Sequence, residues 1–167
     1  MPVAQYLDHI AKRYKLGNAT EHTFRGDLQQ LLESIVPDIA ATNEPKRQSC
    51  GAPDFILTRK DIPIGFIEAK DIGDTDLDGI KKTGNKEQFD RYKASLGNLI
   101  FTDYLHFHFY KNGEFITKLS IGEIVHGKIV PNAANFNSFI YFIKEFCTHV
   151  GQTIKSPKKL AEMMAGK

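Results

Sequence analysis

The spacing of apolar residues along the chain predicts four helices. Apolar side chains recur every three or four positions over residues 3–16, 20–35 and 136–149, and a weaker helical pattern covers 85–96. Gly17 and Pro37 follow the first two patterns, at places where helices commonly end. The strongest pattern begins after Asn135, a residue suited to the position that precedes a helix.

Shorter apolar runs predict the strands of a mixed sheet. A connection of hairpin length separates residues 54–58 from 64–70, so we expect these two strands to pair antiparallel. Residues 99–102 suggest a buried strand, and the alternating segment 105–110 is followed by an Asn112-Gly113 turn and a partner strand at 115–119. The segment 39–50 fits either a strand or a loop. A crossover helix at 85–96 then favours an α/β fold.

The composition is that of one soluble domain. The chain of 167 residues is 41% hydrophobic and 25% charged, which is sufficient to build a core and keep the protein soluble. Its formal net charge of +2 permits binding to a polyanion but does not by itself indicate it. It has no apolar stretch of membrane-spanning length, and we expect a cytoplasmic protein with no membrane partner. Cys50 and Cys147 lie far apart and outside any CxxC pattern, which favours ordinary thiols.

Three charged residues near the predicted hairpin suggest a metal site. Glu68 and Lys70 are two apart on one strand, so their side chains share a face, while Ala69 points to the other. Asp54 arrives from the neighbouring strand. Taken singly, Asp54 fits a turn after Pro53, and the other two fit a surface ion pair. Together, at the end of an apolar run where burying charge is costly, they favour a functional site.

The chemistry of such a site follows from its charges. A divalent cation held by the carboxylates of Asp54 and Glu68 and the carbonyl of Ala69 could activate water and stabilise a negatively charged transition state. If the reaction is hydrolysis of a phosphodiester, Lys70 could position the water, deprotonate it or stabilise the phosphorane transition state. The sequence leaves these three roles of Lys70 open.

The motif formed by Pro53-Asp54 and Glu68-Ala69-Lys70 resembles that of the PD-(D/E)XK nuclease superfamily. Gln88 and Tyr92 form a Gln-x-x-x-Tyr pattern similar to one that follows the catalytic lysine in RecB-like and type I restriction branches; alone, they would fit an ordinary helix face. The resemblance implies a three-layer restriction-endonuclease-like fold, with helices flanking a mixed central sheet, and Mg²⁺ as cofactor, for which Mn²⁺ can substitute. The implied catalytic set is Asp54, Glu68, Lys70, Gln88 and Tyr92.

Glu21 resembles the acidic residue that many of these nucleases carry on the first core helix, where it helps to bind the metal. The implied metal ligands are therefore Asp54, Glu68 and Glu21, with Glu33 and Asp27 as competitors for the place of Glu21. An alternative role for Glu21 is electrostatic stabilisation of a helix N-terminus.

Several segments are similar to the N-terminal nuclease domain of single-chain restriction-modification enzymes of type ISP and type IIG. They are residues 21–25, 43–45, 51–55, 65–73 and 98–104. Those enzymes fuse the nuclease to an adenine methyltransferase and, in type ISP, also to a helicase-like translocase. This sequence contains no Asn-Pro-Pro-Tyr and no GxxxxGK[ST]. We therefore expect a nuclease domain at 1–150, with 151–167 either a linker toward a missing domain or a surface helix.

Basic residues near the motif predict a rim that binds DNA phosphates. Arg25, one turn after Glu21, could pair with it or with a phosphate. The remaining candidates are Lys46, Arg47, Lys81, Lys82, Lys86 and Arg91. Four aspartates between residues 71 and 78 interrupt this set, so a solvated loop of mixed charge is the alternative.

The resemblance as a whole implies a Mg²⁺-dependent endonuclease domain that cleaves double-stranded DNA and leaves target recognition to other domains. One such site breaks one strand, so double-strand cleavage requires a transient dimer or two successive nicks. Two alternatives are a RecB-like repair or recombination nuclease and a noncatalytic DNA-binding or assembly module with the same fold.

Overall fold

A computed structural model describes residues 2–17, 23–43, 53–79 and 83–148, apart from the side chains of 83–85. The predicted tail at 151–167 lies outside these ranges. The described helices are α1 (Val3–Lys15), α2 (Arg25–Ile35), α3 (Thr83–Ser95), α4 (Phe136–Cys147) and the 3-10 turn η2 (Ala133–Asn135). The strands are β1 (Ala40–Asn43), β2 (Phe55–Arg59), β3 (Ile62–Ala69), β4 (Asn98–Thr102), β5 (His106–Lys111), β6 (Glu114–Ser120), β7 (Gly122–Val125) and β8 (Lys128–Pro131).

The first six strands form one mixed sheet in their order along the chain. The pairing of β3 with β4 is parallel, with Ile67 opposite Ile100, and the other pairings in this sheet are antiparallel. Helix α3 makes the crossover that a parallel pair requires. The predicted α/β fold with a mixed sheet is confirmed, as is the antiparallel pairing of the two strands that carry the motif.

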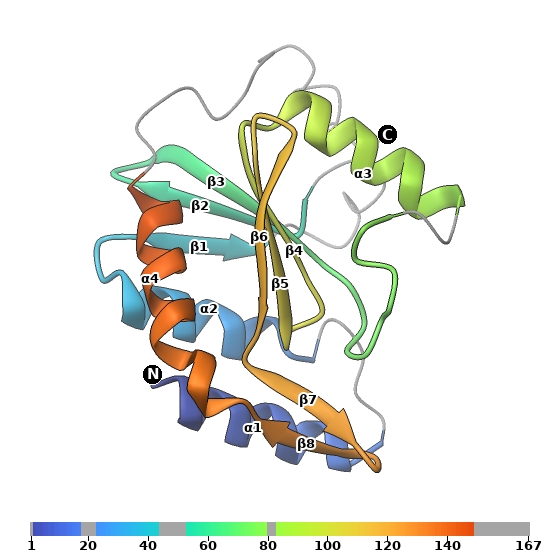
Figure 1. The fold of residues 1–167 in the computed structure, drawn as a ribbon. Helices are drawn as coiled ribbons and strands as arrows, with labels where there is room; N and C mark the ends of the chain where they lie inside the picture. The colour runs from blue at the N-terminus through green and yellow to red at the C-terminus, as the bar shows by residue number, and fades with distance from the viewer. Residues whose placement is uncertain (1, 18–22, 44–52, 80–82, 149–167) are drawn as a thin grey trace.

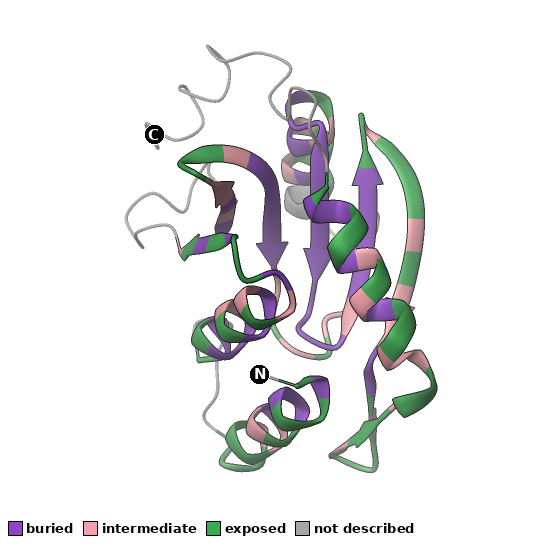
Figure 2. Cartoon of the chain, turned by 90° about the vertical axis from the view of Figure 1, so that its left-hand side faces the viewer, coloured by how far each residue is buried: buried purple, intermediate pink, exposed green. Residues whose placement is uncertain are grey.

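Alternation along the central strands gives the sheet an apolar surface on both faces. Ile67 and Ala69 of β3 belong to a large buried cluster with residues of α1, α2 and α4, whereas Phe66 joins a smaller cluster with Phe89 and Tyr92 of α3. Figure 1 shows the same arrangement, with α3 on the opposite side of the sheet from α2 and α4. The central strands are buried along most of their length (Figure 2). The molecule therefore has the predicted three layers.

A short ribbon, β7 and β8, is an element that the sequence analysis did not predict. Its two strands pair antiparallel and β8 contacts α1, so the ribbon extends the layer below the sheet (Figure 1). Each strand has only four residues, and the turn between them places His126 and Gly127 at positive φ. Such short, largely exposed strands carry little periodic signal.

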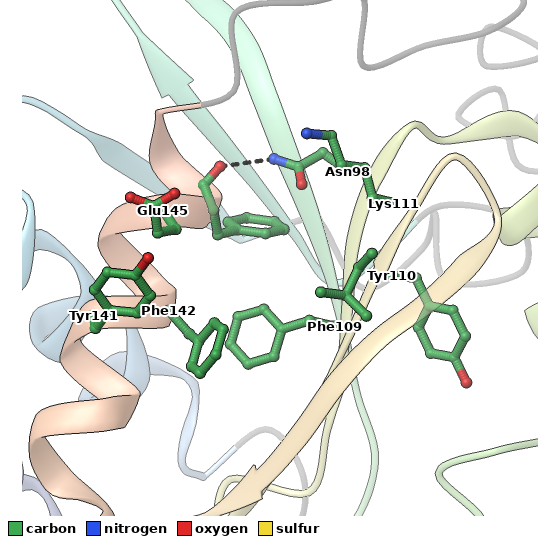
Figure 3. Close-up of a pocket in the computed structure, with 9 residues that line it drawn as sticks. Asn98, Phe109, Tyr110, Lys111, Tyr141, Phe142 and Glu145 are labelled. Atoms are coloured by element: carbon green, nitrogen blue, oxygen red, sulfur yellow. Dashed lines mark hydrogen bonds between the residues drawn. The ribbon is translucent and has the colours of Figure 1, made fainter.

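Hydrogen bonds and aromatic contacts attach the end of α4 to the sheet. The side-chain amide of Asn98 donates to the carbonyls of Ile64 and Phe146, each at 2.8 Å, and the second bond is drawn in Figure 3. Below it, the rings of Phe109 and Phe142 approach with centroids 5.9 Å apart along a groove of about 300 Å³. These contacts fix α4 against β3, β4 and β5.

No helix in the described ranges is long and apolar enough to cross a membrane. Cys147 is a buried free thiol whose pKa burial raises to about 12, so it remains protonated at neutral pH. This agrees with its interpretation as an ordinary thiol, while Cys50 lies outside the described residues.

Replacement of Gly65 by alanine is expected to destabilise the fold. A Cβ at this position in β3 would lie 2.5 Å from the ring of Phe146, so α4 would have to shift. We expect Gly65→Ala to lower the free energy of unfolding by about 1–3 kcal/mol, as other overpacked cores do. Gly26→Ala in α2 is the matched control, since nothing lies within 4 Å of its added Cβ. Urea denaturation of both variants tests this, and equal stabilities would contradict it.

Candidate active site

The pairing of β2 with β3 places Asp54 beside the end of β3. Phe55 pairs with Ile67, so the next position of the antiparallel register sets Asp54 beside Glu68. Asp54 Oδ2 accepts a hydrogen bond of 2.8 Å from the backbone N–H of Ala69. The preceding Pro53 has no N–H to leave unpaired at the start of the strand. The structure therefore brings Asp54 to Glu68 and Lys70, as the spacing predicted.

Lys70 is fixed from three directions. Its backbone N–H donates to the carbonyl of Thr102, across the parallel pair of β3 and β4, at 2.8 Å. Its Nζ lies 3.4 Å from Oε2 of Glu68, whose residue is only 5% exposed. The same Nζ donates to Oε1 of Gln88 at 2.8 Å. The ammonium group is thus held by one carboxylate and one neutral amide.

Helix α3 supplies Gln88 and Tyr92 from one of its faces. The helix is anchored by Phe89, whose ring stacks on that of Phe101 with a centroid distance of 3.8 Å. Gln88 Nε2 lies 3.5 Å from the hydroxyl oxygen of Tyr92, one turn along the helix. Burial, reinforced by the negative charge of Glu68, raises the pKa of Tyr92 well above its usual value, so the phenol stays neutral. The Gln-x-x-x-Tyr pattern therefore lines the site through a direct contact with Lys70.

Arg25, at the start of α2, makes a short charged contact with Asp54. One guanidinium nitrogen, Nη2, lies 2.5 Å from Oδ1 of Asp54, and the side chains are only 11% and 13% exposed. The sequence analysis had considered Glu21 or a phosphate as partners of Arg25. Its contact with Asp54 was not predicted, because the sequence pattern does not specify how α2 packs against β2. The role of Arg25 in DNA binding stays a prediction.

The competitors of Glu21 as a metal ligand have other partners. Glu33 Oε2 accepts the N–H of Ala41 at 2.9 Å, and Asp27 accepts a 2.7 Å hydrogen bond from Arg13 Nε. Glu21 itself lies outside the described residues, so its predicted role stays untested. The same is true of four predicted DNA-binding residues, which are Lys46, Arg47, Lys81 and Lys82.

Two predicted DNA-binding residues are described on α3. Lys86 is exposed and bonds to Asp90 one turn along the helix, with Nζ and Oδ2 2.6 Å apart. Arg91 is partly buried, with its guanidinium carbon 5.6 Å from the centroid of the Tyr92 ring. Lys86 is therefore accessible to a phosphate, while Arg91 helps to cover the buried tyrosine.

The donor atoms suit a hard divalent cation that retains part of its water shell. Within the described ranges, no group of three or more His, Cys, Asp or Glu side chains is arranged to hold a metal. Asp54 and Glu68 nevertheless supply carboxylate oxygens at one place, and Mg²⁺ is commonly held in proteins by one or two carboxylates together with waters. The residues present therefore fit Mg²⁺ or Mn²⁺ with incomplete protein coordination.

A second polar cluster fixes the loop that follows β3. Asp103, just after β4, accepts the N–H of Gly73 at 3.2 Å through Oδ2, and both of its oxygens lie 3.1 Å from His106 Nδ1. His106 Nε2 contacts Glu123 of β7 at 3.0 Å. The hydrogen bond to Asp103, together with both acidic charges, raises the pKa of His106 to about 9.

The neighbouring His108 is different, although it shares the face of His106 on β5. Its Nδ1 lies 3.0 Å from Oδ1 of Asp78, but burial outweighs the acidic neighbour and lowers its pKa. Each of the two histidines therefore has its own acidic neighbours, Asp103 and Glu123 for His106 and Asp78 for His108.

Comparisons with known proteins support the fold. Neither a protein-family model nor a curated protein matches the sequence. Among solved structures, the chain is similar to DrdV in a cryo-EM structure of a DrdV–DNA complex, with a TM-score of 0.58 and 21% sequence identity. The match covers 86% of this chain but only 13% of the DrdV chain. This likeness shows a shared fold over most of the described structure.

The contacts of His106 predict a pH dependence of stability. Because its folded pKa of about 9 lies above the ordinary value of 6.5, its contribution is fully present below about pH 6.5 and is lost as the pH rises through 9. His106→Asn should remove this loss between pH 6 and pH 9.5, as measured by urea denaturation. His126→Asn, in the exposed β7–β8 turn, is the control and should keep the wild-type profile. Identical profiles for all three proteins would contradict the prediction.

Proposed function

We propose that this chain is the Mg²⁺-dependent nuclease domain of a DNA-cleaving protein, with phosphodiester hydrolysis as its reaction. The observation that carries the proposal is the convergence of Asp54, Glu68 and Lys70 at the end of β3, with Gln88 bound to the lysine. Two carboxylates and an ammonium group match the charges that hydrolysis of a phosphodiester requires.

Each side chain has a role that follows from its contacts. Asp54 and Glu68 would hold the cation, which when bound supplies Lewis-acid activation of water. Lys70 faces the same site, where the neutral amide of Gln88 accepts its hydrogen bond and Glu68 lies 3.4 Å from its Nζ. The ammonium group can then orient the attacking water or stabilise charge on a phosphate oxygen. Tyr92 restrains Gln88 from within the buried layer.

DNA is the proposed substrate. The structural similarity to DrdV in a complex with DNA supports a DNA-related domain, and the chain spans only a small part of DrdV. We propose that target recognition belongs to other domains, with a methyltransferase of a restriction-modification enzyme as the expected partner. On this proposal the chain alone cleaves poorly, because the base-reading groups lie elsewhere, and double-strand cleavage requires two nuclease domains or successive nicks.

Lys70→Ala is expected to separate cleavage from metal binding. Loss of one preorganised charge typically costs about a hundredfold or more in rate, whereas the two carboxylates remain in place. Nicking of supercoiled plasmid by the intact protein and Mn²⁺ binding followed by electron paramagnetic resonance measure the two properties. Lys111→Ala is the matched control, since Lys111 is exposed and pairs with Asn98 at the opposite end of β4.

The outcomes of this experiment are distinct. Cleavage lost in Lys70→Ala but retained in Lys111→Ala, with Mn²⁺ still bound, supports the assignment. Asp54→Asn should lose both Mn²⁺ binding and cleavage. Full cleavage by Lys70→Ala or Asp54→Asn would overturn the proposed function.

A further inference from the structure

We propose that Arg25 is an internal counter-ion of Asp54 that competes with the divalent cation for Asp54 Oδ1, and so limits the metal affinity of the site. This inference rests on the proposed function, because it takes Asp54 as a metal ligand. On this proposal Arg25 holds the carboxylate of Asp54 inside the site, whereas the sequence analysis considered it as a contact for a DNA phosphate.

The two oxygens of Asp54 are bound in different ways. Oδ2 accepts the backbone N–H of Ala69, which is part of the β3 strand and cannot move away alone. Oδ1 is bound by the guanidinium group of Arg25, at the end of a long and flexible side chain. Oδ1 is therefore the oxygen that can be transferred from one cation to another, while Oδ2 keeps the carboxylate in place.

Burial makes the competition strong. The side chains of Arg25 and Asp54 are 11% and 13% exposed, so water and salt screen their charges weakly. A divalent cation bound to Oδ1 would face a positive charge a few ångströms away in this setting, and repulsion of that kind is larger than at a surface. The cation must either displace Arg25 or bind less tightly beside it.

The charge balance indicates that Arg25 is the group that yields. The described site contains two acidic side chains, Asp54 and Glu68, and two basic ones, Arg25 and Lys70. Lys70 donates to Gln88, whereas Arg25 bonds directly to the carboxylate oxygen of Asp54 that a cation would need. Removing the charge of Arg25 leaves a net negative site, which favours a divalent cation.

Mn²⁺ binding to the 167-residue chain tests the proposal. Arg25→Gln removes the charge, and we expect its Mn²⁺ affinity to rise roughly tenfold or more, the order by which a close charge alters ion affinity. Arg25→Lys keeps the charge and should stay near the wild-type affinity. Arg13→Gln is the matched control, since Arg13 pairs with the buried Asp27 at 2.7 Å outside the site. Isothermal titration calorimetry gives the affinities directly.

Thermal unfolding supplies a second readout. Without metal, Arg25→Gln should melt below the wild type, because Asp54 loses its cationic partner. Saturating Mn²⁺ should raise its melting temperature more than that of the wild type, since tighter binding stabilises the folded state further. If Arg25→Gln is unfolded without metal, Mn²⁺ should restore its folding, and failure to do so overturns the proposal.

The remaining outcomes separate this inference from the proposed function. Binding that Asp54→Asn abolishes but Arg25→Gln leaves unchanged or weakens overturns the inference alone. An affinity gain in Arg13→Gln as large as that in Arg25→Gln also overturns it, because the effect would then be general. Absence of Mn²⁺ binding in both the wild type and Arg25→Gln overturns the inference together with the metal site.

Discussion

The placement of charge at the end of a buried strand is the constraint on which the site depends. Strand β3 lies between two hydrophobic layers and ends with Glu68 and Lys70, whose charges need partners where water is scarce. The partners come from separate elements, because Asp54 precedes β2 and Gln88 lies on α3. Arg25 of α2 completes the set from the opposite side of the sheet. The site can therefore form only when all three layers have assembled.

The parallel pairing of β3 with β4 decides which end of the sheet collects these groups. Both strands finish at the same edge, so the residues that follow them lie close together. Thr102 receives the N–H of Lys70 there, and Asp103 fixes the next loop through Gly73. His106 then joins Asp103 to Glu123 of the β7–β8 ribbon. The loop after β3 is thus connected to the β7–β8 ribbon through Asp103 and His106.

Local patterns were sufficient to predict the strand part of the site, and insufficient for the contribution of α2. Alternation and hairpin spacing specify which residues share a strand face, so Asp54, Glu68 and Lys70 were found together. Gln88 and Tyr92 were expected from the resemblance of their Gln-x-x-x-Tyr pattern to a nuclease motif, since their spacing alone fits an ordinary helix face. The contact of Arg25 with Asp54 could not be predicted, because it depends on the position of α2 relative to β2, which packing of the core determines. The β7–β8 ribbon was missed for a related reason, since four-residue strands are set by contacts with α1.

The two basic side chains of the site, Lys70 and Arg25, have different hydrogen-bond partners, and we expect them to have different roles for this reason. Lys70 donates to the neutral amide of Gln88, and its Nζ lies 3.4 Å from Oε2 of Glu68. Arg25 instead contacts Asp54 at 2.5 Å and neutralises it. Two basic side chains without acidic partners would attract DNA but repel a metal ion. Two basic side chains that are both fully paired with carboxylates would not attract DNA. In the proposed reaction, Lys70 stays in place to contact a phosphate, and Arg25 can leave Asp54 so that a metal ion binds there.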